Sequence, residues 1–263
     1  MMCRHWVAFF VLAVLFVSCS KSIDDAGDNI ENKETSEQTF FYSQRIYKSG
    51  DYDSKAWRMP ALLCTDKGVL IAINDKRKLN SADLPNDIDI VCRRSFDNGR
   101  TWTEPSYIYQ ATGVENGCSD PAIVQASNGD IICAYVGDNG TIESTLENPI
   151  NSYITISKDQ GETWGDRKTI TSQLWGPKAE REECRKYIGS FFTSGNGLRL
   201  NRGLFKDRIM FVVPMCRPKS GDDIFSDGDF VTDDYVIYSD DNGVTWHLSE
   251  CAFTGEPVRK VTD

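Results

Sequence analysis

An octapeptide with the pattern S-x-D-x-G-x-T-W occurs three times in this chain of 263 residues, and no other feature restricts its fold as strongly. The copies are SFDNGRTW at 95–102, SKDQGETW at 157–164 and SDDNGVTW at 239–246. Five fixed positions in eight do not recur three times in one chain by chance. Self-similarity of this kind indicates an architecture built from repeated structural units.

The fixed residues of the octapeptide suit a hairpin turn. The Asp carboxylate can accept hydrogen bonds from backbone amides of the loop, the Gly tolerates positive φ, and the Thr-Trp pair re-enters a strand where the indole packs. We therefore predict structural roles for Asp97, Asp159 and Asp241. Calcium binding is the alternative for an acidic turn, but the ligand spacing of a calcium loop is missing, so we predict no metal site.

Strand-like segments surround each octapeptide. Residues 59–73, 120–136 and 195–213 have the pattern of strand, tight turn and strand, and a β-rich run directly precedes each octapeptide. One repeat therefore contains four strands, which predicts an all-β fold of the propeller type. Residues 177–189 are either a short helix or a loop between the second and third repeats.

The first 38 residues differ from the rest of the chain. Residues 1–19 have basic Arg4 followed by a short apolar run, as in a secretory signal peptide, and the end of the run resembles a lipoprotein cleavage box with Cys19 as the lipidated residue. Residues 20–38 are a polar linker, and the folded part is expected from 39 to 263. We therefore expect membrane attachment only through a lipid anchor, at the outer membrane or cell surface, with the periplasm or secretion as alternatives.

Charge and cysteine content exclude two kinds of partner. Without Arg4 the chain keeps 28 basic against 39 acidic residues, so nucleic acid is not an expected partner. The cysteines after Cys19 are irregularly spaced and form no C-x-x-C pair, which argues against zinc. Four of them lie in apolar runs and are expected in the core rather than in disulfides: Cys64, Cys92, Cys133 and Cys216.

Specific residues give the chain a family resemblance over about residues 40–255. The octapeptides match the Asp box, and Trp57-Arg58-Met59-Pro60-Ala61 resembles the Arg-Ile-Pro signature of bacterial sialidases of glycoside hydrolase family 33. The resemblance implies a six-bladed sialidase-type β-propeller, of which this chain holds about three blades.

The resemblance also implies roles for four side chains. Arg58 resembles one of three arginines that clamp the sialic acid carboxylate, a task suited to a planar guanidinium. Asp83 takes the place of the general acid/base, and Arg77 and Asp120 take the places of residues beside the O4 hydroxyl of the sugar. Asp87 and Asp89 are competing acids, but Asp83 lies in a Pro-containing loop that is free to face a cleft.

The implied function is that of an exo-α-sialidase that removes terminal sialic acids from glycoproteins, glycolipids or oligosaccharides with retention and without a cofactor. In the family a tyrosine nucleophile, its glutamate base and two further arginines follow the third Asp box. Only 17 residues follow Trp246. The isolated chain is therefore expected to be inactive, and a non-catalytic, lipid-anchored propeller that binds glycans is the alternative.

Overall fold

The computed structural model describes residues 43–141, 143–219 and 230–251. The chain divides into two compact units, Met1–Ser43 and Gln44–Asp263, and the description that follows concerns the second. The predicted signal peptide, the lipidation site at Cys19 and the polar linker lie outside the described residues.

The first sheet contains four antiparallel strands in chain order, β1 (Ala56–Cys64), β2 (Leu70–Arg77), β3 (Ile88–Ser95) and β4 (Ser106–Tyr109). A 3-10 turn, η1 (Asp51–Asp53), precedes it and another, η2 (Val114–Asn116), follows it. Leu70 pairs with Ser95, so the turn between β1 and β2 and the first octapeptide lie at the same end of the sheet.

The second sheet repeats this order with β5 (Cys118–Gln125), β6 (Ile131–Gly137), β7 (Asn151–Ser157) and β8 (Lys168–Thr169). A fifth, very short strand, β10 (Gly195–Asn196), pairs in parallel with β5. The chain thus runs along the edge of the second sheet before it enters the third.

The third sheet contains β11 (Leu198–Arg199), β12 (Ile209–Pro218), β13 (Phe230–Ser239) and β14 (His247–Leu248), with β9 (Gly189–Ser190) paired to β12. The first strand of this unit is shorter than the sequence predicts, because residues 195–196 pair with β5 of the second sheet and only Leu198–Arg199 pair with β12.

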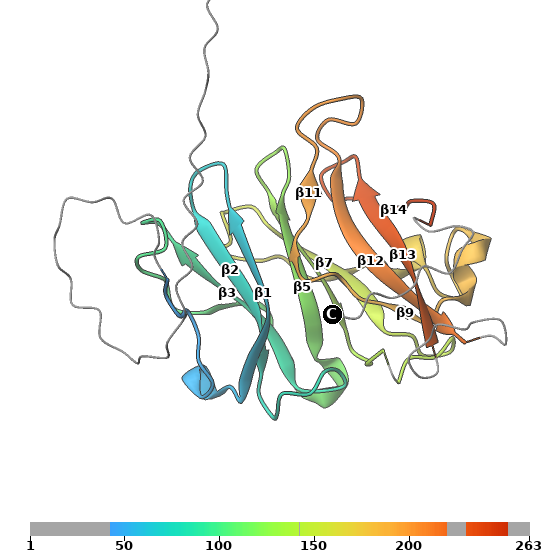
Figure 1. The fold of residues 1–263 in the computed structure, drawn as a ribbon, viewed down its shortest axis with the longest axis horizontal. Helices are drawn as coiled ribbons and strands as arrows, with labels where there is room; N and C mark the ends of the chain where they lie inside the picture. Colours follow the sequence, from blue (N-terminus) through green and yellow to red (C-terminus); the bar gives the residue numbers. More distant parts are fainter. Residues whose placement is uncertain (1–42, 142, 220–229, 252–263) are drawn as a thin grey trace, which may run out of the picture. The chain divides into compact units, whose positions relative to one another are not determined.

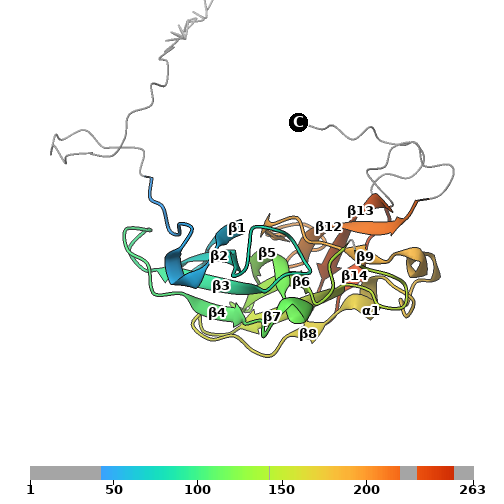
Figure 2. The same ribbon diagram turned by 90° about the horizontal axis from the view of Figure 1, so that it is seen from below.

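The three sheets pack face to face in chain order, as Figures 1 and 2 show. One apolar cluster joins the first sheet to the second, with Ile71 and Ile73 against Ile123 and Cys133. A larger cluster joins the second to the third and includes Trp246. Each sheet therefore buries its faces against its neighbours, as the blades of a propeller do, which confirms the all-β prediction.

The three octapeptides form the predicted turns. In the first, Asp97 accepts hydrogen bonds from the Thr101 amide at 2.9 Å and the Thr101 hydroxyl at 2.6 Å, and Gly99 has a φ of 84°. Asp159 and Asp241 accept the equivalent bonds from Thr163 and Thr245. These hydrogen bonds hold the pKa of Asp97 at about 2, and they hold the pKa values of Asp159 and Asp241 below the usual range.

Two predictions need correction or refinement. Cys64 was expected in the core but is exposed, because it ends β1 on the side that faces no other sheet, whereas Cys92, Cys133 and Cys216 are buried free thiols as expected. The segment 177–189 is mostly loop, with a single 3-10 turn, η3 (Glu182–Lys186), and a four-residue helix, α1 (Thr171–Leu174), precedes it. Across the described ranges, no helix has the length and apolar character that crossing a bilayer requires.

Candidate functional site

Two bulges of the same kind begin the first two blades. Met59 and Asp120 each precede a proline and each has positive φ, 50° and 58°. The strand register shifts at both places, between Arg58 and Ala61 and between Ser119 and Ala122. A residue before proline normally adopts an extended conformation, so both are strained, and a bulge of this kind redirects the neighbouring side chains.

The acid loop, residues 78–87, crosses from β2 to β3 at the same end of the molecule. Asn86 anchors it internally by donating to the Ala82 carbonyl at 2.8 Å and to Asn80 Oδ1 at 3.0 Å. The loop rests on two glycines of the second blade. A Cβ atom at Gly140 would lie 2.1 Å from the Leu84 oxygen, and one at Gly117 would lie 2.0 Å from the Asn86 oxygen.

Asp83 of the acid loop lies between two arginines of the first blade. Its Oδ1 atom is 3.1 Å from Arg58 Nη1 and 2.7 Å from Arg77 Nη1. The Asp83 side chain remains 70% exposed. Three of the predicted site residues are therefore brought together by strand β1, strand β2 and the loop that follows β2.

Arg77 is fully buried, with a side-chain exposure of 0%. Besides Asp83, its guanidinium donates to the carbonyls of Ser81 at 2.8 Å and Ala82 at 2.7 Å, and to Asp75 Oδ2 at 3.0 Å. The sequence predicts that Arg77 contacts the sugar. In this arrangement such a contact requires Asp83 to turn away, and Arg77 instead holds the acid loop in place.

Asp75 is a buried carboxyl group that links the first two blades. Its Oδ2 atom accepts from Arg77 and also from the Ser119 hydroxyl at 2.6 Å. Burial raises the pKa of Asp75, the nearby charge of Asp120 adds to this, and the bonds from Ser119 and Arg77 oppose it. The sequence patterns gave no sign of Asp75, because its partners come from different blades.

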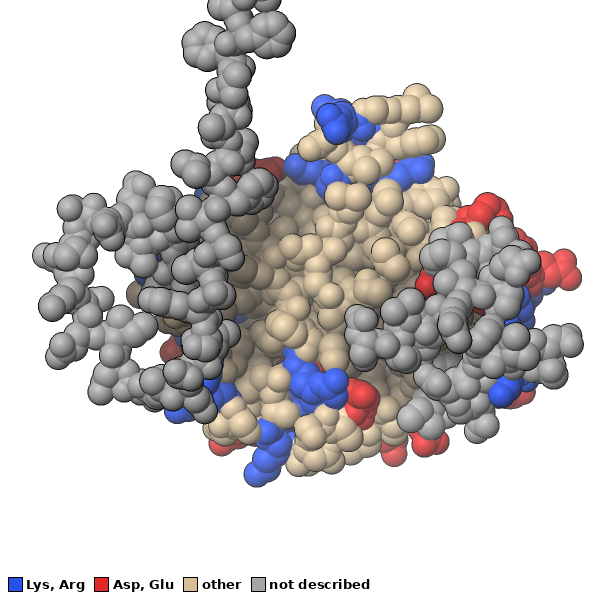
Figure 3. Space-filling view, in the orientation of Figure 1, with Lys and Arg blue, Asp and Glu red and all other residues tan. Residues whose placement is uncertain are grey.

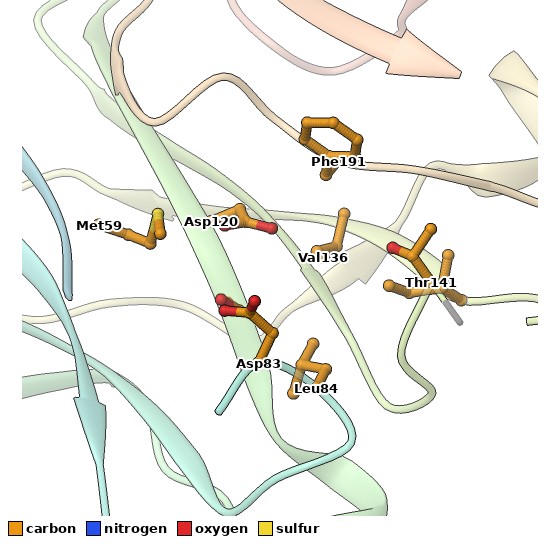
Figure 4. A pocket seen from close by; sticks show the side chains of 9 residues that line it. Met59, Asp83, Leu84, Asp120, Val136, Thr141 and Phe191 are labelled. Carbon is orange, nitrogen blue, oxygen red and sulfur yellow. The ribbon is translucent and has the colours of Figure 1, made fainter. Parts of the chain in front are cut away.

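Asp120 faces Asp83 across a pocket of about 270 Å³. Figure 4 shows the two carboxyl groups pointing toward the same space, with Phe191, Val136 and Thr141 on its far side. Burial raises the pKa of Asp120 to about 6, and the charge of Asp83 adds to this effect, while Arg77 and Arg58 oppose it. The pocket therefore holds one exposed carboxyl group and one largely buried carboxyl group against a largely apolar wall.

The competing acids lie elsewhere. Asp89 is buried on β3 with its carboxylate 3.0 Å from Lys78 Nζ, and Asp87 pairs with the same lysine. Neither lines the pocket. Trp175 and Phe192 are buried in the core, whereas the neighbouring Phe191 lines the pocket. Within the described ranges no three His, Cys, Asp or Glu side chains lie together as a metal site requires.

Comparison with known proteins identifies the family of the chain. Residues 59–255 match the model of the BNR repeat-like domain family. The chain is 26% identical to a sialidase of Bacteroides fragilis over 235 residues, which covers 83% of this chain and 39% of the relative. It is 28% identical to a sialidase of Micromonospora viridifaciens over 237 residues, which covers 86% of this chain and 34% of the relative. The chain thus spans between a third and two fifths of the length of these relatives.

Solved structures show the same fold. The Hadza microbial sialidase Hz136 superposes with a TM-score of 0.64 at 25% identity, covering 78% of this chain and 39% of that structure. The intramolecular trans-sialidase from Ruminococcus gnavus superposes with a TM-score of 0.60 at 14% identity, covering 78% of this chain and 62% of that structure. The described sheets correspond to part of such a propeller. The chain therefore belongs to the BNR repeat-like domain family, as a sialidase-type protein with Asp boxes.

Proposed function

We propose that this chain carries the acid side of an exo-α-sialidase site that releases terminal α-linked sialic acids from glycoconjugates with retention and without a cofactor. The proposal rests on the position of Asp83, which pairs with Arg58 and Arg77 and faces Asp120 across the pocket. An exposed carboxyl group on a loop is suited to donate a proton to a departing glycosidic oxygen and to accept one later.

Arg58 is the residue we propose for recognition of the substrate carboxylate. Its guanidinium is exposed and close to Asp83, so an incoming carboxylate can replace Asp83 as its partner. Asp120 is then placed to accept a hydrogen bond from a sugar hydroxyl at the inner wall. Arg77 contributes through Asp83 and the acid loop.

Binding of a sialylated glycan tests this proposal without requiring turnover. In saturation-transfer NMR, 3′-sialyllactose should receive saturation on its sialic acid protons, and lactose should receive none. Arg58→Ala should weaken binding by about fivefold, the value of one charge-assisted contact at an exposed site. The control is Arg202→Ala, an exposed arginine outside the pocket lining. Equal signals from lactose, or an unaffected Arg58→Ala variant, would exclude this pocket as a sialic acid site.

Catalysis is a separate part of the proposal. Among the described residues no tyrosine lines the pocket. We therefore expect that the chain alone hydrolyses a fluorogenic sialoside no faster than the uncatalysed background. A chimaera in which this chain replaces the matching region of the Bacteroides fragilis sialidase should be active, and Asp83→Ala in it should abolish turnover. Activity of the isolated chain that Asp83→Ala removes would show that the chain contains its own nucleophile.

The non-catalytic alternative uses the same pocket. The absence of a lining tyrosine among the described residues favours it. An inactive but correctly folded chimaera that still binds sialyllactose would support a glycan-binding propeller. Attachment at Cys19 and a location at the outer membrane or cell surface remain predictions, to be tested by metabolic labelling with a fatty acid and by Cys19→Ala.

A further inference from the structure

The end of the molecule opposite the pocket is built from turns of all three blades. The pairs Leu70 with Ser95 and Ile209 with Ser239 place each first turn beside an octapeptide. Contacts between blades connect these turns. Asp66 N donates to Gln125 Oε1 at 2.7 Å, and the Ser127 hydroxyl lies 3.0 Å from Asn242 Oδ1. Arg58 and the acid loop lie at the other ends of these strands, so the two surfaces face in opposite directions.

This turn end carries the most exposed apolar side chains of the described residues. Leu204 is 91% exposed, Val244 is 72% exposed and Phe96 is 65% exposed. Val244 and Phe96 occupy variable positions of two octapeptides, and Leu204 lies in the turn between β11 and β12. Phe205, next to Leu204, is also exposed. Scattered exposed apolar residues need no explanation, but the gathering of the three largest exposures at one end does.

The hairpin of residues 199–208 combines this apolar tip with positive charge. It contains four basic residues and one acidic residue in a chain of net charge −10. Arg202 and Lys206 flank Leu204 and Phe205 and are exposed. Figure 1 shows the hairpin extending beyond its neighbours, and Figure 3 shows basic side chains gathered around it.

The base of the hairpin is firmly held. Arg208 stacks on the rings of Phe205 and Tyr238 at 4.0 Å each and pairs with Asp240 at 2.7 Å. Arg199 donates to the Ala126 carbonyl at 2.9 Å. The tip is therefore presented in a fixed orientation, which lowers the entropic cost of binding.

We propose that the 199–208 hairpin is a docking element for a lipid surface that contains anionic headgroups. Arg199 and Arg208 at the base of the hairpin pair with Asp66 and Asp240, whereas Arg202 and Lys206 are exposed beside the tip. A protruding apolar tip flanked by these two basic side chains matches the layers of a membrane interface, where acyl chains lie beneath charged headgroups. The tip extends beyond the neighbouring turns (Figure 1), as insertion between lipid headgroups requires. Docking in this way turns the pocket away from the membrane and toward glycans in the medium.

A tryptophan reporter at the tip of the hairpin tests docking in the full chain. It reports on the hairpin itself and not on the lipid anchor predicted at Cys19. Leu204→Trp is mixed with vesicles of phosphatidylcholine containing a third phosphatidylglycerol and brominated acyl chains. Its emission, taken as the difference from the parent protein, should fall at least about twofold through quenching at the acyl boundary. The matched control is Leu79→Trp, an exposed position in the acid loop at the pocket end, which should remain unquenched.

Charge reversal tests the chosen lipid. Arg202→Glu with Lys206→Glu should lower the partitioning of the Leu204→Trp protein on the order of tenfold. Pure phosphatidylcholine vesicles should give little quenching. Two quenching results would overturn the proposal: equal quenching of Leu79→Trp and Leu204→Trp, or no quenching of Leu204→Trp. A change in Leu204→Trp emission on adding a soluble anionic polysaccharide, without a change on adding vesicles, would also overturn it.

Discussion

Trp102, Trp164 and Trp246 hold the same position in the three octapeptides but are buried to different depths. Trp246 is buried against the second blade, where Gly243 of its turn contacts Ile132. Trp102 is only half-buried, and Trp164 is partly buried against the apolar cluster shared by the first two blades. The indoles of Trp102 and Trp246 both donate to the glycine carbonyl of their own turn at 3.1 Å. The difference between them is therefore one of packing between blades.

Replacement of these two tryptophans should have unequal effects on stability. Trp246→Ala should lower the free energy of unfolding by about 3 to 5 kcal/mol, because it removes a large buried side chain and leaves a cavity. Trp102→Ala should cost about half as much or less. Urea unfolding followed by far-UV circular dichroism measures both, and equal losses would contradict a role in packing between blades.

Because the pKa of Asp120 is raised in the folded protein, we expect the free energy of unfolding to depend on pH. The unfolded chain ionises this group near 3.8, whereas the folded protein keeps the proton to about 6. The folded state therefore binds more protons at Asp120 between these values, so the contribution of Asp120 to stability falls as pH rises from about 4 to about 6 and then levels off. Asp75, whose pKa burial raises to about 8, extends the fall in stability above pH 6. Urea titrations at several pH values measure this change. Between about pH 4 and about pH 6, the free energy of unfolding of Asp120→Asn should fall by about 1 to 2 kcal/mol less than that of the parent protein. A fall of the same size in the variant would assign the effect to another group.

At the scale of elements, the acid loop depends on the absence of side chains on the second blade. Gly140→Ala should displace residues 78–87, because the new Cβ would lie 2.1 Å from the Leu84 oxygen. We expect a loss of about 1 to 3 kcal/mol and faster deuterium exchange in the loop. The control is Gly113→Ala, where a Cβ would have nothing within 4 Å. Unchanged exchange in Gly140→Ala would show that the position of the loop does not depend on its contact with Gly140.

Elements that depend on local pattern could be predicted from the sequence. The strands around each octapeptide agree with what the local pattern indicates. The family resemblance, rather than the pattern, assigned Arg58, Arg77, Asp83 and Asp120 to one site, and these residues lie close together in the structure. The bulges at Met59 and Asp120 could not be predicted, because the local rule for a residue before proline favours an extended conformation. Phe191 was also missed, because it reaches the pocket from the long connection between the second and third blades.

At the scale of the whole molecule, the packing of the sheets protects most thiols. Five described cysteines are buried, and burial raises the pKa of each thiol: Cys92, Cys118, Cys133, Cys184 and Cys216. Among the described cysteines, Cys64 and Cys251 should therefore react first with iodoacetamide under native conditions, and the five buried thiols only in denaturant. Peptide mapping by mass spectrometry measures this order, and early labelling of Cys133 would contradict the packing of the first blade on the second.

The paired bulges at Met59-Pro60 and Asp120-Pro121 bear on how the two blades arose by duplication. Both stand at the start of a blade, at the same place in the repeat, and both aim a side chain into one pocket. Duplication of a single ancestral hairpin would have copied the bend together with the strand. Under such a duplication, a new residue on the copied kink is enough for a thioether in one blade and a carboxyl group in the next to share one cavity.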